Sequence, residues 1–158
     1  MSRYPLEITF YEGIESLKWH KIFKMFFQCE RYYHIGIGSG DYEIFVTPHR
    51  KPIMFKKKRL HKIWKPHLII QLKDIEVTPD NLNDYIPENF FPHHPIITCV
   101  CCVLESTFIC PWRPDSCSTL VCIVLNKLGI NIPLTSSPRK IRRWLDENNC
   151  IYRQSYSR

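Results

Sequence analysis

Apolar and polar positions alternate over several short stretches of this chain, which is the pattern of half-buried β-strands. The alternation predicts a short strand at residues 5–10 (PLEITF) and another at 31–38 (RYYHIGIG). The turn signal at 39–41 (SGD) and a further strand at 42–48 (YEIFVTP), ended by Pro48, come directly afterwards. Residues 31–48 are therefore expected to form a β-hairpin.

Four more segments are predicted to be strands. They are 52–55 (PIMF) within a basic stretch at 49–67, then 67–72 (HLIIQL), 73–79 (KDIEVTP) and 96–105 (IITCVCCVLE). Residues 80–95 contain three prolines and read as a loop, as do residues 106–116.

Helical spacing of apolar residues appears at three places. Residues 14–27 read as an amphipathic helix, and residues 117–128 as a second helix that stops at Gly129. Residues 138–149 form the third, with Ser137 as candidate N-cap and Pro138 as its first residue. An early helix, a run of antiparallel strands and late helices predict an α+β fold. We expect a single domain over 1–158, with its core at about 14–147 and a short C-terminal tail at 148–158.

Composition is that of a globular protein, with 158 residues, 44% hydrophobic and 23% charged. The net charge of +7 favours contact with nucleic acid, an anionic membrane or an acidic partner, although it also serves solubility. Two basic segments, 56–65 and 139–144, each contain a tryptophan that could stack on bases while the cations contact phosphates. The alternative is that both are solvated faces whose long side chains cover apolar surface.

The first residues lack the apolar run of a signal peptide, and no apolar stretch approaches the ~20 residues of a membrane span. We therefore expect a soluble protein whose eight cysteines stay reduced. The cysteines do not form the two C-x-x-C pairs typical of structural zinc. His93, His94 and Cys99 could in principle join a metal site, but we expect neither metal nor cofactor.

Cys117 opens the predicted helix 117–128, behind Asp115 or Ser116 as N-cap. Free backbone N–H groups and the helix dipole at this position lower the pKa of a thiol and favour the nucleophilic thiolate. The same N–H groups could hold an oxyanion. Cys122, one turn further along, has none of these advantages and reads as packing. The alternative is that Cys117 is also a buried core residue. A cysteine acts as a nucleophile only with a base nearby, and the helix start alone does not supply one.

His34 is the histidine that stands inside a predicted strand, and alternation places Gly36 and Gly38 on its face. Those glycines leave room for another backbone or for a substrate. The other histidines are His20, His49, His61, His67, His93 and His94. A strand histidine with apolar neighbours can equally be a satisfied core residue.

The hairpin register decides which residue faces His34. If Gly40-Asp41 is a two-residue turn, Thr47 pairs with His34 and its hydroxyl could orient the imidazole. If the turn slips to Ser39-Gly40, Phe45 faces His34 instead. Glu43 is an acidic alternative that sits nearer the turn.

A histidine on one strand, a hairpin partner after it and a cysteine opening a later helix follow one another here. This order resembles the circularly permuted NlpC/P60 branch of the papain-like thiol hydrolases, and within it small phage-encoded proteins. The matching motifs are RYYHIGIG, EIFVTP, PDSCSTLVCIVLNKLGI and SSPRKIRRWL, spread over residues 20–146.

The resemblance implies an antiparallel sheet with the nucleophile-bearing helix packed on it. It also implies Cys117 as nucleophile, His34 as base and an amide, peptide or ester bond as substrate. Thr47, from the hairpin register, would orient the imidazole in such a hydrolase. The expected location is the host cytoplasm or the virion. Thr47 stands where such phage proteins often carry an acidic residue, and a hydroxyl stabilises an imidazolium less than a carboxylate does. Two alternatives therefore remain: an inactive relative that binds a virion or host protein, and a basic nucleic-acid-binding protein.

Overall fold

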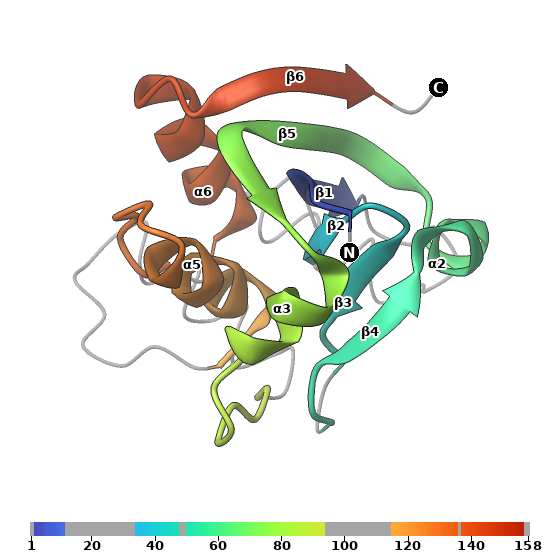
Figure 1. Cartoon of the computed structure of the whole chain (residues 1–158). Helices are drawn as coiled ribbons and strands as arrows, with labels where there is room; N and C mark the ends of the chain where they lie inside the picture. The colour runs from blue at the N-terminus through green and yellow to red at the C-terminus, as the bar shows by residue number, and fades with distance from the viewer. Residues whose placement is uncertain (1, 12–33, 48–49, 94–114, 136, 157–158) are drawn as a thin grey trace, which may run out of the picture.

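The computed structural model describes residues 2–11, 34–47, 50–93, 115–135 and 137–156. They form a mixed α+β structure with a six-stranded antiparallel sheet and four helices (Figure 1). The strands are β1 (Tyr4–Tyr11), β2 (His34–Ser39), β3 (Tyr42–Phe45), β4 (Ile53–Lys56), β5 (Pro66–Val77) and β6 (Ile151–Tyr156). The helices are α2 (Lys57–Ile63), α3 (Pro79–Asp84), α5 (Cys117–Lys127) and α6 (Pro138–Glu147). The expected α+β class is confirmed.

Strand order across the sheet is β4-β3-β2-β1-β5-β6, so that β1 lies between β2 and β5. The predicted hairpin is confirmed with Gly40-Asp41 as its turn, because Ser39 pairs with Tyr42 and Ile37 with Ile44. Gly40 has a φ of 56°, in the left-handed region that glycine adopts at little cost.

Residues 67–77, expected to belong to two strands, lie in one long strand, β5, while Thr78 and Pro79 belong to the start of α3. The separation that the sequence suggested corresponds to an irregularity inside β5. Asp74 has a φ of 54°, and the pairing with β1 shifts register between Pro5 and Glu7. Residues 151–156, expected to lie in a C-terminal tail, form edge strand β6 on β5.

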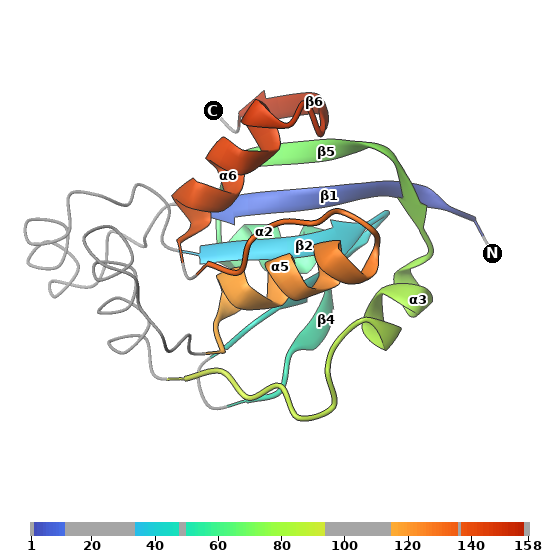
Figure 2. The same ribbon diagram turned by 90° about the vertical axis from the view of Figure 1, so that its left-hand side faces the viewer.

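One face of the sheet carries the main core. Isoleucines and leucines of β1, β2 and β5 pack there against buried residues of α3, α5 and α6. Figure 2 shows α5 and α6 lying across this face. Both late helices are confirmed, α5 with Ser116 as N-cap and α6 with Ser137 as N-cap and Pro138 in its first turn.

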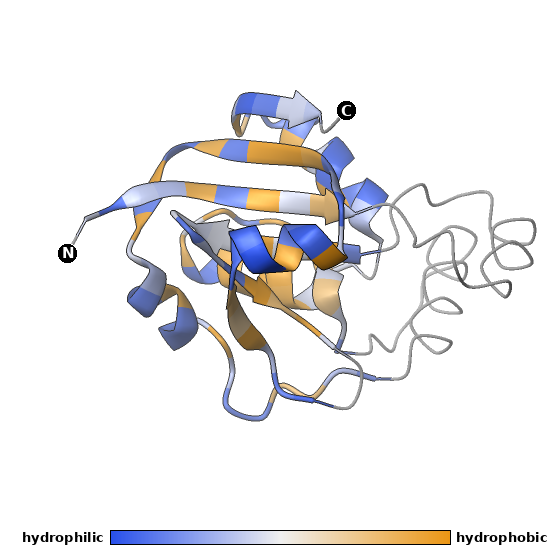
Figure 3. Ribbon diagram, turned by 90° about the vertical axis from the view of Figure 1, so that its right-hand side faces the viewer, coloured by the Kyte–Doolittle hydropathy of each residue, from blue (hydrophilic) through white to orange (hydrophobic). Residues whose placement is uncertain are grey.

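The opposite face is covered by α2 (Figure 3). Leu60 of this helix is buried against Tyr11 and Phe45. The sequence did not predict this helix because its residues, KKRLHKI, have almost no apolar period. It also did not predict α3, a short helix in the expected loop 80–95 that Thr78 caps.

The helix expected at 14–27 lies outside the described residues, and so does the strand expected at 96–105. Among the helices that are described, none is both long and apolar enough to cross a bilayer.

Candidate functional site

Cys117 is the first residue of α5, and the chain around it is firmly capped. The Ser116 hydroxyl accepts a hydrogen bond from the N–H of Thr119, while the Thr119 hydroxyl accepts one from the N–H of Ser116. This reciprocal pair is a capping box, which fixes the first turn of a helix. Cys117 is half-buried and packs at the edge of the main core, whereas Cys122 is fully buried in it.

The surroundings of the Cys117 thiol differ from the sequence expectation. Burial raises the pKa of this thiol above its usual value of 9.0. Hydrogen bonding from the backbone N–H of Ile35, and from the hydroxyl and backbone N–H of Ser118, lowers the pKa but does not outweigh burial. The Ser118 hydroxyl is itself buried, and its geometry falls short of a full hydrogen bond. Cys117 is therefore a neutral thiol at pH 7.

His34 begins β2, directly across the ladder from Tyr11, and its side chain is only 8% exposed. Its ring packs among aromatic side chains, with centroid distances of 4.1 Å to Phe45, 5.8 Å to Tyr11 and 6.0 Å to Trp64. Burial lowers the pKa of His34 from 6.5 to about 3, so the imidazole is neutral at pH 7. Its Nε2 atom has no hydrogen-bond partner among the described residues.

Thr47 lies beyond the ladder that would pair it with His34. The register set by Ile37 and Ile44 would bring Thr47 opposite His34 if it continued, but the pairing of β2 with β3 ends at Ile37 and Ile44. The Thr47 hydroxyl is buried and, like Nε2 of His34, has no hydrogen-bond partner in the part of the chain that the structure describes. The two groups therefore do not bond to each other, and the role expected for Thr47 stays a prediction.

Cys117 and His34 approach the same end of β2 from different sides. Because side chains alternate along a strand, Ile35 points toward α5 while His34 points toward α2. The thiol lies at the backbone N–H of Ile35, the residue after His34. In the hairpin pattern that N–H points toward β3, whose ladder with β2 ends at Ile37 and Ile44. The thiol therefore occupies the place where β3 has left β2.

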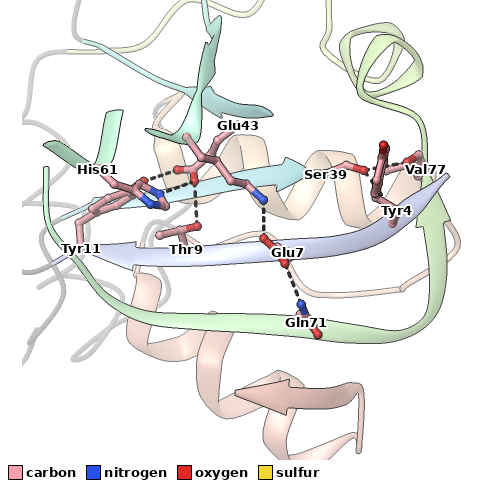
Figure 4. Close-up of polar contacts among 10 residues, drawn as sticks. Tyr4, Glu7, Thr9, Tyr11, Ser39, Glu43, His61, Gln71 and Val77 are labelled. Carbon is pink, nitrogen blue, oxygen red and sulfur yellow. Dashed lines mark hydrogen bonds and ion pairs between the residues drawn. The ribbon is translucent and has the colours of Figure 1, made fainter. Parts of the chain in front are cut away.

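A buried carboxylate network fills the face of the sheet beneath α2, and sequence reasoning missed it. Glu43 is fully buried and accepts hydrogen bonds from Tyr11 (2.6 Å) and Thr9 (2.8 Å), as Figure 4 shows. Nε2 of His61 lies 3.5 Å from the same carboxylate. The useful sequence signal was alternation, which places Thr9, Tyr11 and Glu43 on one face once the strand order is known.

The room beside Gly36 is occupied by this network. A Cβ added at Gly36 would lie 2.0 Å from Oε1 of Glu43. At Gly38 the added atom would meet the carbonyl of Tyr42 at 2.5 Å. The expected space for a substrate at the two glycines is therefore taken up by the protein itself.

Among the described residues, no group of three or more His, Cys, Asp or Glu side chains is placed to hold a metal ion. His93, a weak metal candidate, accepts a hydrogen bond from the N–H of Asp115 at Nδ1 (3.2 Å). The backbone N–H of His93 donates to the backbone carbonyl of Asp115 (2.8 Å). The N–H of Phe91 also donates to the Asp115 carboxylate (3.0 Å), so these bonds tie residues 91–93 to the segment that leads into Cys117. His94 and Cys99 lie outside the described residues.

The two basic segments do not share a surface. Segment 56–65 includes α2 on one face of the sheet, and segment 139–144 lies in α6 on the other (Figures 2 and 3). Trp64 turns inward to Phe45 and His34, and Trp144 packs against the main core. Neither tryptophan is fully exposed for stacking on a base.

Comparison with known proteins finds no matching family model, no matching curated protein and no matching solved structure, so this site stands on its own geometry.

Proposed function

We propose that this chain is a thiol hydrolase that cleaves an amide, peptide or ester bond, with a fold related to the permuted NlpC/P60 type. The observation that carries the proposal is the place of Cys117. It begins a capped helix and sets its thiol at the start of β2, one residue from His34. A half-buried cysteine at this position combines partial access with backbone N–H groups at a helix start.

In the proposed reaction, Sγ of Cys117 attacks the substrate carbonyl carbon. The His34 ring, which lies on the α2 side of β2, must turn toward the thiol to accept its proton. The carbonyl oxygen becomes an oxyanion beside the free N–H groups at the start of α5. Collapse of this intermediate releases the leaving group with the proton from His34 and leaves a thioester on Cys117. Water then hydrolyses the thioester, with His34 again accepting a proton.

Burial determines how such a site would work. It raises the pKa of Cys117 and lowers that of His34, so both groups start neutral and a resting thiolate–imidazolium pair is disfavoured. Proton transfer would then accompany attack, as it does for a serine nucleophile. Slow turnover with an activated ester is the expected consequence.

The same pKa directions favour a second candidate, an inactive relative on the same scaffold that binds a virion or host protein. In that case Cys117 and His34 are core residues. A host cytoplasmic or virion location fits both candidates.

Alkylation with iodoacetamide across pH, read by mass spectrometry, separates them. In a hydrolase, Cys117 reacts faster than Cys150, the other half-buried thiol in the described part of the chain, and His34→Ala removes the difference. A Cys122→Ala protein serves as the matched cysteine control. If Cys117 reacts no faster than Cys150, or if His34→Ala changes nothing, the hydrolase proposal fails.

A further inference from the structure

The outer face of α2 is almost entirely cationic. Leu60 is buried against the sheet, and Lys57, His61 and Trp64 are half-buried on the same inner side. The helical period turns the remaining side chains outward, and Lys58, Arg59, Lys62 and Ile63 are all exposed. Figure 3 shows α2 in front of the sheet, with most of its ribbon in the colours of hydrophilic residues.

Nothing acidic in this segment offsets the charge. Residues 50–65 include no Asp or Glu, and further exposed cations flank the helix at Lys51, Lys56 and Lys65. Glu7 pairs with Lys57 on the inner side and so leaves the outer cations without a counter-ion from β1. No ion pair within the described residues engages Lys58, Arg59 or Lys62.

Two exposed isoleucines stand beside these cations. Ile63, at the end of α2, is 67% exposed and Ile53, on β4, is 43% exposed. Ile53 pairs with Phe45, so it points to the α2 side of the sheet. The Phe45 ring lies 5.4 Å from that of Trp64, the neighbour of Ile63. Both isoleucines therefore lie at the same end of α2.

We propose that this surface, which we call the α2 face (Lys58, Arg59, Lys62, Ile63, Lys65, Ile53), binds the surface of an anionic membrane. Cations attract acidic headgroups, and the isoleucines enter the boundary between headgroups and acyl chains. Nucleic acid fits less well because Trp64 is turned inward and the outer side of α2 carries no Asn, Gln, Ser or Thr for base edges. The proposal is independent of the chemistry at Cys117.

Sedimentation of the full chain with lipid vesicles tests the proposal. One set contains phosphatidylcholine alone, and in the other about a third of the lipid is phosphatidylserine. We expect binding to the anionic vesicles only, weakening as salt shortens the range of the attraction. Replacing Lys58, Arg59 and Lys62 together by Gln should weaken binding about a hundredfold, because each cation contributes about fivefold. Ile63→Asn should weaken it about tenfold without changing the charge.

The matched control replaces three exposed cations elsewhere, Lys127, Arg143 and Arg153, by Gln. It removes the same charge from α5, α6 and β6 and should leave most of the binding intact. Equal loss in the control and the α2 variant would mean that net charge alone acts, which overturns the proposal. The proposal would also be overturned if duplex DNA competed with the vesicles and Ile63→Asn had no effect on binding. That result would favour a nucleic-acid-binding surface. Absence of binding to anionic vesicles overturns it directly.

Discussion

The carboxylate of Glu43 lies over the backbone of Gly36, where any larger residue would place its Cβ. The added atom would come 2.0 Å from Oε1 of Glu43, although the Gly36 backbone needs no special conformation. Gly36 is thus required by the buried carboxylate on the neighbouring strand and not by a turn.

Gly36→Ala should lower the free energy of unfolding by about 3 kcal/mol or more, because it displaces a buried charge from its hydrogen-bond donors. Urea unfolding monitored by circular dichroism measures the change. Gly129→Ala is the control, since Gly129 has a φ of 89° but no atom of the described residues within 4 Å of an added Cβ. That variant should cost only about 1–2 kcal/mol of backbone strain. Equal losses in the two variants would contradict the close contact at Gly36.

Tyr11→Phe should also destabilise the fold, by about 1.5–3 kcal/mol, since it removes a charge-assisted hydrogen bond of 2.6 Å to buried Glu43. The ring remains, so packing against Phe45 is conserved. Tyr152→Phe removes a hydroxyl from an exposed side chain and should change stability by less than about 0.5 kcal/mol. A Tyr11→Phe protein as stable as the wild type would mean that the Glu43 carboxylate is satisfied without this donor.

Burial of His34 makes stability depend on pH. Its pKa is about 3 in the folded chain and 6.5 when unfolded, so between these values the unfolded state binds more protons. Stability from this residue is therefore fully present above pH 6.5 and is lost as the pH falls toward 3, by about 1.4 kcal/mol per pH unit.

His34→Phe should remove that slope while it keeps an aromatic ring beside Phe45. Chemical denaturation of both proteins at several pH values between 7 and 4 gives the difference, in which titration of all other groups cancels. Parallel curves for the two proteins would show that His34 is solvated in solution.

The thiol environment predicts a shift in reactivity. The Ser118 hydroxyl lowers the pKa of Cys117, so Ser118→Ala should move the midpoint of Cys117 alkylation to higher pH. Cys122 should stay unreactive in both proteins, because it is fully buried in α5. An unchanged or lower midpoint would show that the hydroxyl does not face the thiol.

Local signals predicted the elements that make local contacts. The hairpin, with Gly40-Asp41 as one of two possible turns, and the cap at Ser137 were predicted, and Ser116 was one of two candidate caps for α5. Each of these features depends on residues within a few positions. Helix α2 was not predicted from the sequence. Only Leu60 and the half-buried Trp64 mark its inner side, and most of its other residues are charged. Its helical form depends on contacts with β1 and β3 that the segment itself does not reveal.

For the candidate site too, the positions of residues along the chain were predicted, but their burial and their long-range contacts were not. Helical and strand periodicity placed Cys117 at a helix start and His34 on a strand, but neither indicates how deeply a side chain is buried. Desolvation reverses the expected direction for the Cys117 pKa. The Glu43 network depends on strand order, because Tyr11 and Glu43 are 32 residues apart in the chain.

The central place of β1 bears on how the chain folds. This strand is made before both of its partners, and it pairs with β2 on one side and with β5, some sixty residues later, on the other. Until Val77 has been synthesised, one edge of β1 has no partner from β5, and its buried residues Ile8 and Phe10 lack part of their cover. Pairing over such separations is slow, on the order of milliseconds to seconds. A nascent chain would therefore carry an open, apolar strand edge for much of its synthesis, and this is the period in which it is most prone to aggregate.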